Sequence, residues 1–157
     1  VKDNITIAYL DMVTKGKVVV DGKKEKAVCD ELIEKLRIKC PGRDAMAGSL
    51  SGGNQQKIVI AKWFMGDPDL LIMDEPTRGI DIGAKAEIYR LMDELVKSGK
   101  SIIMISSETP ELLGMSDRVI VMHEGYKTGE FLCSELDQDK LMAYAIGEGE
   151  TYVQNQG

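Results

Sequence analysis

The feature that most limits the fold is a pair of short apolar runs, each of which ends in polar residues. Residues 70–73 are Leu-Leu-Ile-Met and lead directly into an Asp-Glu-Pro sequence. Residues 101–106 form a second run, which ends in Ser106 and is followed by Ser107. Runs this short are typical of strands buried in a parallel sheet. The sequence therefore predicts two parallel strands with polar groups at their carboxyl ends.

Apolar residues at helical spacing occur before the first strand and between the two strands. This spacing occurs over 23–37, in the segment after the glycines of 51–53, and between Asp81 and Gly99. Asp81 is expected to cap the amino end of the third helix and Gly99 to terminate it. Further elements are expected as a short helix over 108–114, strands over 118–122 and 126–131 with a turn between them, a helix over 134–146, and a polar tail over 147–157. This order predicts an α/β fold with parallel strands, followed by a hairpin.

The charge and the cysteine content argue against several classes of protein. The 157 residues carry a net charge of -6, which does not suit a broad nucleic-acid surface, so no nucleic-acid partner is expected. The 3 cysteines include no CxxC pair and predict free thiols rather than a zinc site or a disulfide framework. The apolar runs are far shorter than the ~20 residues that cross a bilayer. Work at a membrane would therefore need a tether.

The first motif suited to phosphate chemistry is Leu-Ser-Gly-Gly-Asn at 50–54. Its glycines let the backbone approach a ligand closely, and the amino end of the following helix favours an anion. Ser51 adds a hydroxyl donor. Taken alone, such a motif is more often a flexible helix cap than a phosphate site.

The second motif is the acidic end of the first strand. Ligands of open α/β sheets bind at this edge, so Asp74 is a candidate ligand for Mg²⁺. Glu75 is a candidate group to orient or deprotonate an attacking water. Taken alone, the pair also fits a strand that ends in an acidic turn.

The two motifs occur in order, and 74 − 51 = 23 positions separate Ser51 from Asp74. Arg-Gly-Ile-Asp at 78–81 and Ser-Ser-Glu at 106–108 follow them. From about residue 48 to 131, this series resembles the ABC ATPase family, a P-loop NTPase-like fold. The resemblance implies a signature motif at 50–54, a Walker B strand at 70–74, a catalytic glutamate at 75 and a D-loop at 79–81. The implied site residues are Ser51, Gly52, Gly53 and Gln55 on ATP in trans, Asp74 on Mg²⁺, Glu75 in catalysis, Gly79 and Asp81 in the D-loop, and Ser107 at the switch position.

Two longer stretches narrow the resemblance. Residues 74–85 and 106–118 are similar to the ATPases of ribose, galactose and xylose importers, which carry two ATPase domains in one polypeptide. The similarity is to the second domain, although Asn54 stands where most of the family has glutamine. It implies ATP and Mg²⁺ as cofactors and a peripheral place on the cytoplasmic face of the cell membrane. The implied partners are the other ATPase domain, membrane permease subunits and, indirectly, a sugar-binding protein.

Two family features are missing from the sequence. No GxxxxGK[ST] loop occurs, and the fragment at 99–101 has Glu94 where the first glycine should be. Ser107 occupies the position of the family's switch histidine, and the single histidine, His123, is expected to be a surface or packed residue. We therefore expect a truncated ATPase domain that is inactive alone. In the intact protein, the site with Glu75 should hydrolyse ATP poorly. The signature motif should contact ATP that is bound to a partner domain.

The motifs divide the chain into three expected parts: a helical subdomain at 1–47, an ATPase core portion at 48–133, and a helix and tail at 134–157. One alternative function is a non-transport ABC ATPase acting on DNA or ribosomes. Another is an interaction module that never uses nucleotide. A sheet edge left open in a partial domain would also favour self-association of the chain.

Overall fold

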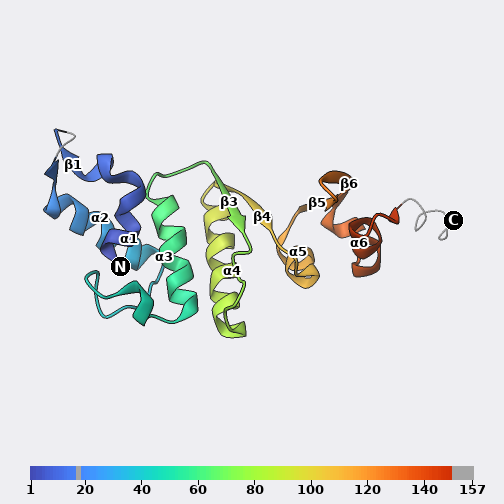
Figure 1. The fold of residues 1–157 in the computed structure, drawn as a ribbon, viewed down its shortest axis with the longest axis horizontal. Helices are drawn as coiled ribbons and strands as arrows, with labels where there is room; N and C mark the ends of the chain where they lie inside the picture. The colour runs from blue at the N-terminus through green and yellow to red at the C-terminus, as the bar shows by residue number, and fades with distance from the viewer. Residues whose placement is uncertain (17–18, 150–157) are drawn as a thin grey trace. The chain divides into compact units, whose positions relative to one another are not determined.

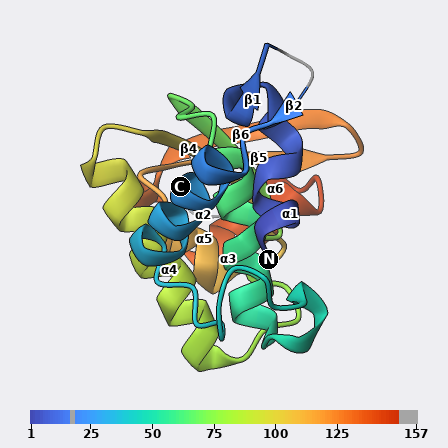
Figure 2. The same ribbon diagram turned by 90° about the vertical axis from the view of Figure 1, so that its left-hand side faces the viewer.

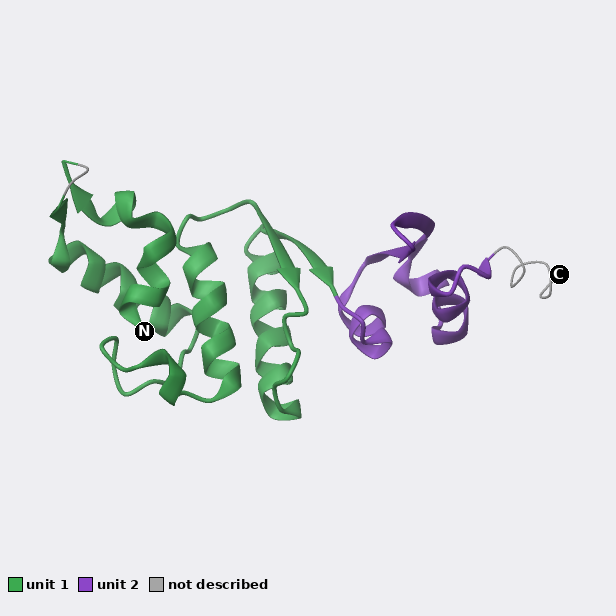
Figure 3. Ribbon diagram, in the orientation of Figure 1, with its two compact units in different colours: residues 1–105 green, residues 106–157 purple. Residues whose placement is uncertain are grey.

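The computed structural model is an α/β fold and describes residues 1–16 and 19–149 (Figure 1). Contacts along the chain divide it into two compact units, residues 1–105 and 106–157 (Figure 3). The three-part division expected from the motifs stays a prediction.

Helices make up the first part of unit 1. The elements are α1 (Lys2–Thr6), η1 (Ile7–Val13), the antiparallel pair β1 (Thr14–Lys15) and β2 (Val19–Val20), α2 (Gly22–Lys35), η2 (Ala47–Ser49) and α3 (Gly52–Phe64). Helix α1 packs against both α2 and α3 (Figure 1, Figure 2). Asp21 caps α2, because its carboxylate accepts hydrogen bonds from two backbone N–H groups of the first turn. Fully buried Ile5 and Cys29 belong to the core of this part.

The second part of unit 1 is a β-α-β segment. Strand β3 (Leu70–Asp74), helix α4 (Ile82–Lys97) and strand β4 (Ser101–Ile105) follow in order, and the strands pair in parallel from Leu70 opposite Ser101 to Asp74 opposite Ile105. Helix α4 buries the apolar face that its spacing predicted, which comprises Ile88, Leu91, Met92 and Leu95. The parallel pair expected from the two apolar runs is confirmed.

The burial of the strands differs from the prediction. Leu71 and Met73 are buried, but Ile72 is 67% exposed, and Ile103 on β4 is 50% exposed. Parallel strands are normally covered on both faces. The sheet described here has only two strands, and the rest of unit 1 covers one set of β3 side chains but not the other.

Unit 2 contains α5 (Thr109–Met115), β5 (Arg118–His123), β6 (Tyr126–Leu132), η3 (Cys133–Glu135) and α6 (Gln138–Ala145). Strands β5 and β6 form the expected antiparallel hairpin. Its turn places Glu124 and Gly125 at positive φ. A small core joins the hairpin to α6 through Val119, Val121, Leu136 and Leu141.

The carboxyl-terminal helix is shorter than expected, because η3 and a capping aspartate, Asp137, precede α6. His123 is packed: its Nδ1 lies 2.8 Å from the carbonyl oxygen of Ala145. The part of the expected tail from residue 150 onward lies outside the described residues. In the part of the chain that the structure describes, no helix is long and apolar enough to cross a membrane.

Candidate functional site

The amino end of α3 exposes the first motif. Ser51 is the N-cap residue in an extended conformation, and its carbonyl oxygen accepts hydrogen bonds of 2.9 Å from the N–H groups of both Asn54 and Gln55. Ser51 and Gly52 are exposed to solvent. The first N–H groups of a helix have no acceptor within the helix and attract anions. The arrangement suits a phosphate group brought from outside.

Both glycines of the motif pack against the start of α4 and the turn before it. A Cβ at Gly52 would lie 3.3 Å from Cγ2 of Ile80, and a Cβ at Gly53 would lie 2.6 Å from Cβ of Ala84. Larger side chains at these positions would push α3 away from this segment. The structure therefore brings the predicted signature and the predicted D-loop together within unit 1.

The D-loop segment is a tight turn closed by a helix cap. Gly79 has φ of 75°, which favours glycine. The Asp81 carboxylate accepts a hydrogen bond of 2.9 Å from the N–H of Ala84, which confirms the predicted cap of α4. This cap fixes where α4 begins and therefore where the turn meets Gly52.

The two acids lie at the carboxyl end of the parallel pair, as the strand pattern predicted. Asp74 is the last residue of β3 and is exposed. Glu75 has φ of 47°, and its N–H donates a hydrogen bond of 2.8 Å to the carbonyl oxygen of Ile105 on β4. This bond extends the pairing past β3 and fixes the backbone of the predicted catalytic residue.

The predicted switch position, Ser107, is exposed and belongs to unit 2. Beside it, the Ser106 hydroxyl donates a hydrogen bond of 2.5 Å to the buried carboxylate of Glu111. The backbone N–H of Glu108 donates in turn to the Ser106 hydroxyl. These contacts fix the turn that precedes α5 within unit 2.

Sequence reasoning missed an ionic cluster behind the signature helix. The Lys57 ammonium donates hydrogen bonds to Glu87 Oε2 (2.9 Å) and to the carbonyl oxygen of Arg37 (3.0 Å). Lys39 donates to Glu87 Oε1 (2.8 Å). Hydrogen bonds from Lys39 and Lys57 lower the pKa of Glu87 to about 2. One sequence signal was present, because Lys57 lies on the otherwise apolar, buried face of α3.

Two amide side chains hold the signature loop. The Gln55 amide donates a hydrogen bond of 2.8 Å to the carbonyl oxygen of Leu50. The Asn54 amide donates one of 2.8 Å to the Ser51 hydroxyl. Asn54, which the sequence singled out only as a departure from the family, therefore touches Ser51 directly.

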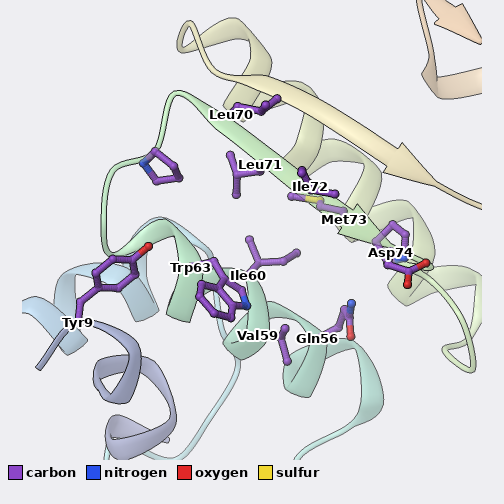
Figure 4. A pocket seen from close by; sticks show the side chains of 12 residues that line it. Tyr9, Gln56, Val59, Ile60, Trp63, Leu70, Leu71, Ile72, Met73 and Asp74 are labelled. Carbon is purple, nitrogen blue, oxygen red and sulfur yellow. The ribbon is translucent and has the colours of Figure 1, made fainter.

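An apolar groove of about 350 Å³ separates α3 from β3 (Figure 4). Val59, Ile60 and Trp63 of α3 face the β3 side chains across it, with Tyr9 near one end and Asp74 near the other. No lysine or arginine is among its lining residues within the described ranges 1–16 and 19–149, so the groove offers no cation to a nucleotide phosphate. Among the described residues, no group of three His, Cys, Asp or Glu side chains gathers as a metal site.

Comparison with known sequences points to one family. The ABC transporter family model matches residues 1–78. The chain is 52% identical over 147 residues to the ribose import ATP-binding protein of Oceanobacillus iheyensis, and 52% identical over 147 residues to the xylose import ATP-binding protein of Thermoanaerobacter pseudethanolicus. Each match covers 94% of this chain but only 29% of the relative. The chain thus spans less than a third of the length of these relatives.

Solved structures show the same fold. A nucleotide-free ATP-binding cassette from an ABC transporter matches with a TM-score of 0.77 at 23% identity, covering 94% of this chain and 62% of that one. A dimeric bacterial ABC transporter cassette matches with a TM-score of 0.65 at 21% identity, covering 79% of this chain and 53% of that one. The α/β fold is that of an ABC cassette.

Proposed function

From the match to the ABC transporter family model and the similarity to import ATP-binding proteins, we propose that the chain belongs to this family and is part of the ATPase that powers a sugar importer. The observation that carries this proposal is the exposed amino end of α3, where Ser51 and Gly52 present donors beside the D-loop turn. The choice of a sugar rests on relatives at 52% identity whose names specify ribose and xylose import.

The ATP that Ser51 serves is held by a second ATPase domain. The printed sequence has no GxxxxGK[ST] loop, which in this fold cradles the β- and γ-phosphates. An exposed helix end can instead reach phosphates carried by a neighbour. Ser51, Gly52 and Gly53 would supply the hydroxyl and N–H donors, and Gln55 would hold the loop through its bond to Leu50. The dimeric state of a similar cassette supports such a pairing.

In the assembled ATPase, the acids after β3 would act on a nucleotide that is bound beside this sheet edge. Asp74 is a single exposed carboxylate, which fits Mg²⁺ bound mainly through phosphate oxygens and water. When bound, Mg²⁺ neutralises charge on the phosphate oxygens. Glu75, fixed by its bond to Ile105, would orient the attacking water. With Ser107 at the switch position, this edge would hydrolyse ATP slowly, and the chain alone would be inactive.

The proposal places the chain at the cytoplasmic face of the membrane. It would bind there to permease subunits, and through them work with a sugar-binding protein. The helical part before α3 would form the contact. The chain's attachment to the membrane would rest on these partners.

A calorimetric titration of the chain with Mg-ATP tests whether the chain binds ATP by itself or depends on a second domain to hold it. The proposal predicts no detectable binding at millimolar nucleotide, because the chain has no phosphate loop of its own. Micromolar binding would contradict it.

ATP-driven uptake of ribose, galactose or xylose by vesicles that carry the assembled importer then tests the transport role. ATP turnover without uptake would favour a non-transport ATPase, and function without ATP would favour an interaction module.

A further inference from the structure

The Asn54 side chain bridges two segments that are far apart in the sequence. Its Nδ2 donates a hydrogen bond of 2.8 Å to Ser51 Oγ. Its Oδ1 accepts a hydrogen bond of 2.8 Å from the backbone N–H of Lys39. Both ends of a short, stiff side chain are therefore in use.

The contact with Lys39 fixes which way round the amide lies. A backbone N–H can only donate, so the atom that faces Lys39 must be the carbonyl oxygen of Asn54. The NH₂ group must then face Ser51, and the serine oxygen must accept from it. A hydroxyl has one hydrogen to donate, and here that hydrogen is left for a group outside the loop.

Lys39 is itself anchored to α4. Its ammonium lies 2.8 Å from Glu87, and Glu87 also binds Lys57, whose side chain is only 5% exposed. Beside this cluster, Arg37 pairs with Glu94 at 2.9 Å. The buried Lys57 ammonium also donates to the carbonyl oxygen of Arg37. This bond, together with the two ion pairs to α4, holds the 37–39 segment, so the N–H that orients Asn54 keeps its position.

We propose that Asn54 is a positioning residue that keeps the Ser51 hydroxyl aimed outward as a hydrogen-bond donor to a nucleotide phosphate, with Lys39 as its anchor. This inference rests on the proposed function, in which Ser51 meets ATP. Asn54 itself need not touch the nucleotide. Asn54 affects nucleotide binding only through the Ser51 oxygen. Experiments can therefore distinguish this effect from a purely structural role of Asn54.

A double-mutant cycle in the assembled importer tests the proposal, with KM for Mg-ATP and kcat as readouts. Ser51→Ala and Asn54→Ala are each expected to raise KM about tenfold to a hundredfold, the size of one hydrogen bond to a charged phosphate. Because Asn54 acts through Ser51, the double variant should match Ser51→Ala alone. Asp93→Ala, which breaks an exposed pair with Lys97 on α4, is the control and should leave KM unchanged.

Asn54→Asp is the second variant and covers the case in which Asn54→Ala fails to fold. The carboxylate still accepts from Lys39 but puts an acceptor against Ser51, which turns the hydroxyl hydrogen inward. KM should then rise more than in Asn54→Ala, with a melting temperature close to that of the wild type.

Three results would overturn the inference. One is an Asn54→Asp variant with the wild-type KM. A second is a double variant whose KM rises by the product of the two single-variant increases, because Asn54 would then act independently of the hydroxyl. The third is an unchanged KM in Ser51→Ala, which would remove the proposed function as well. The first two leave Ser51 as a nucleotide contact, so the two failures are distinguishable.

Discussion

Gly53 and Ala84 lie so close that a Cβ added to Gly53 would be 2.6 Å from the Cβ of Ala84. Both residues sit in the first turns of their helices, α3 and α4. The absence of a side chain at Gly53 therefore sets how near the signature segment comes to the D-loop turn.

Gly53→Ala should lower the free energy of unfolding by about 1–3 kcal/mol through overpacking, even though alanine favours helix by ~1 kcal/mol. Urea unfolding followed by circular dichroism measures the change. Gly48→Ala is the matched control, because a Cβ there meets nothing within 4 Å. Ala84→Gly in the Gly53→Ala background should recover part of the loss. An unchanged or increased stability in Gly53→Ala would show that the two helices are not tightly packed.

Glu87→Gln should destabilise the chain in a pH-dependent way. At neutral pH the loss should be about 1–3 kcal/mol, because Lys57 is left buried without its counterion. The pKa of Glu87 is lowered from its ordinary 4.5 to about 2 in the folded chain. Its stabilising effect is therefore complete above about pH 4.5 and is lost as the pH falls toward 2.

Urea unfolding of the wild type and of Glu87→Gln at pH 7, 5 and 3 checks this prediction. The difference between wild type and Glu87→Gln should be largest at pH 7 and smaller at pH 3. Asp93→Asn, on the same helix but in an exposed pair, should differ little from wild type at each pH. A Glu87→Gln difference that is constant or larger at pH 3 would contradict the ion cluster.

Cys29 should resist alkylation in the folded chain. Its side chain is fully buried, and burial raises the pKa of its thiol to about 11, so the reactive thiolate is scarce at pH 8. Brief treatment with iodoacetamide, followed by peptide mass spectrometry, should modify the partly exposed Cys40 first. Urea should abolish the difference. Equal rates in the native chain would place Cys29 at the surface.

Most of the secondary structure could be predicted from the sequence, because it depends on local signals. The apolar spacing of α4, its cap at Asp81 and the positive φ at Gly99 each follow from neighbouring residues. The parallel pairing of β3 with β4 followed from an intervening helix. The exposure of Ile72 could not be predicted, because it depends on what packs against the sheet rather than on the run itself.

The candidate site was predicted only in part for the same reason. Position along the chain indicated the signature, the acids and the D-loop, and the structure places the first and last of these together. The links from Asn54 to Lys39 and from Lys57 to Glu87 join residues 15 and 30 positions apart. Such links depend on how α3 crosses its neighbours, and a single sequence does not specify that crossing. The roles of the site residues stay predictions.

ATP turnover by the assembled importer carrying Ser51→Tyr tests the central claim most directly. Ser51 is exposed and its side chain does not cap the helix, so tyrosine can be placed there while α3 stays folded. If this chain completes an ATP site on a neighbouring domain, the bulky side chain should block the closing of that site. Turnover should then fall by about a hundredfold or more, the size of losing several donors to a transition-state phosphate. Wild-type turnover in Ser51→Tyr would contradict the account.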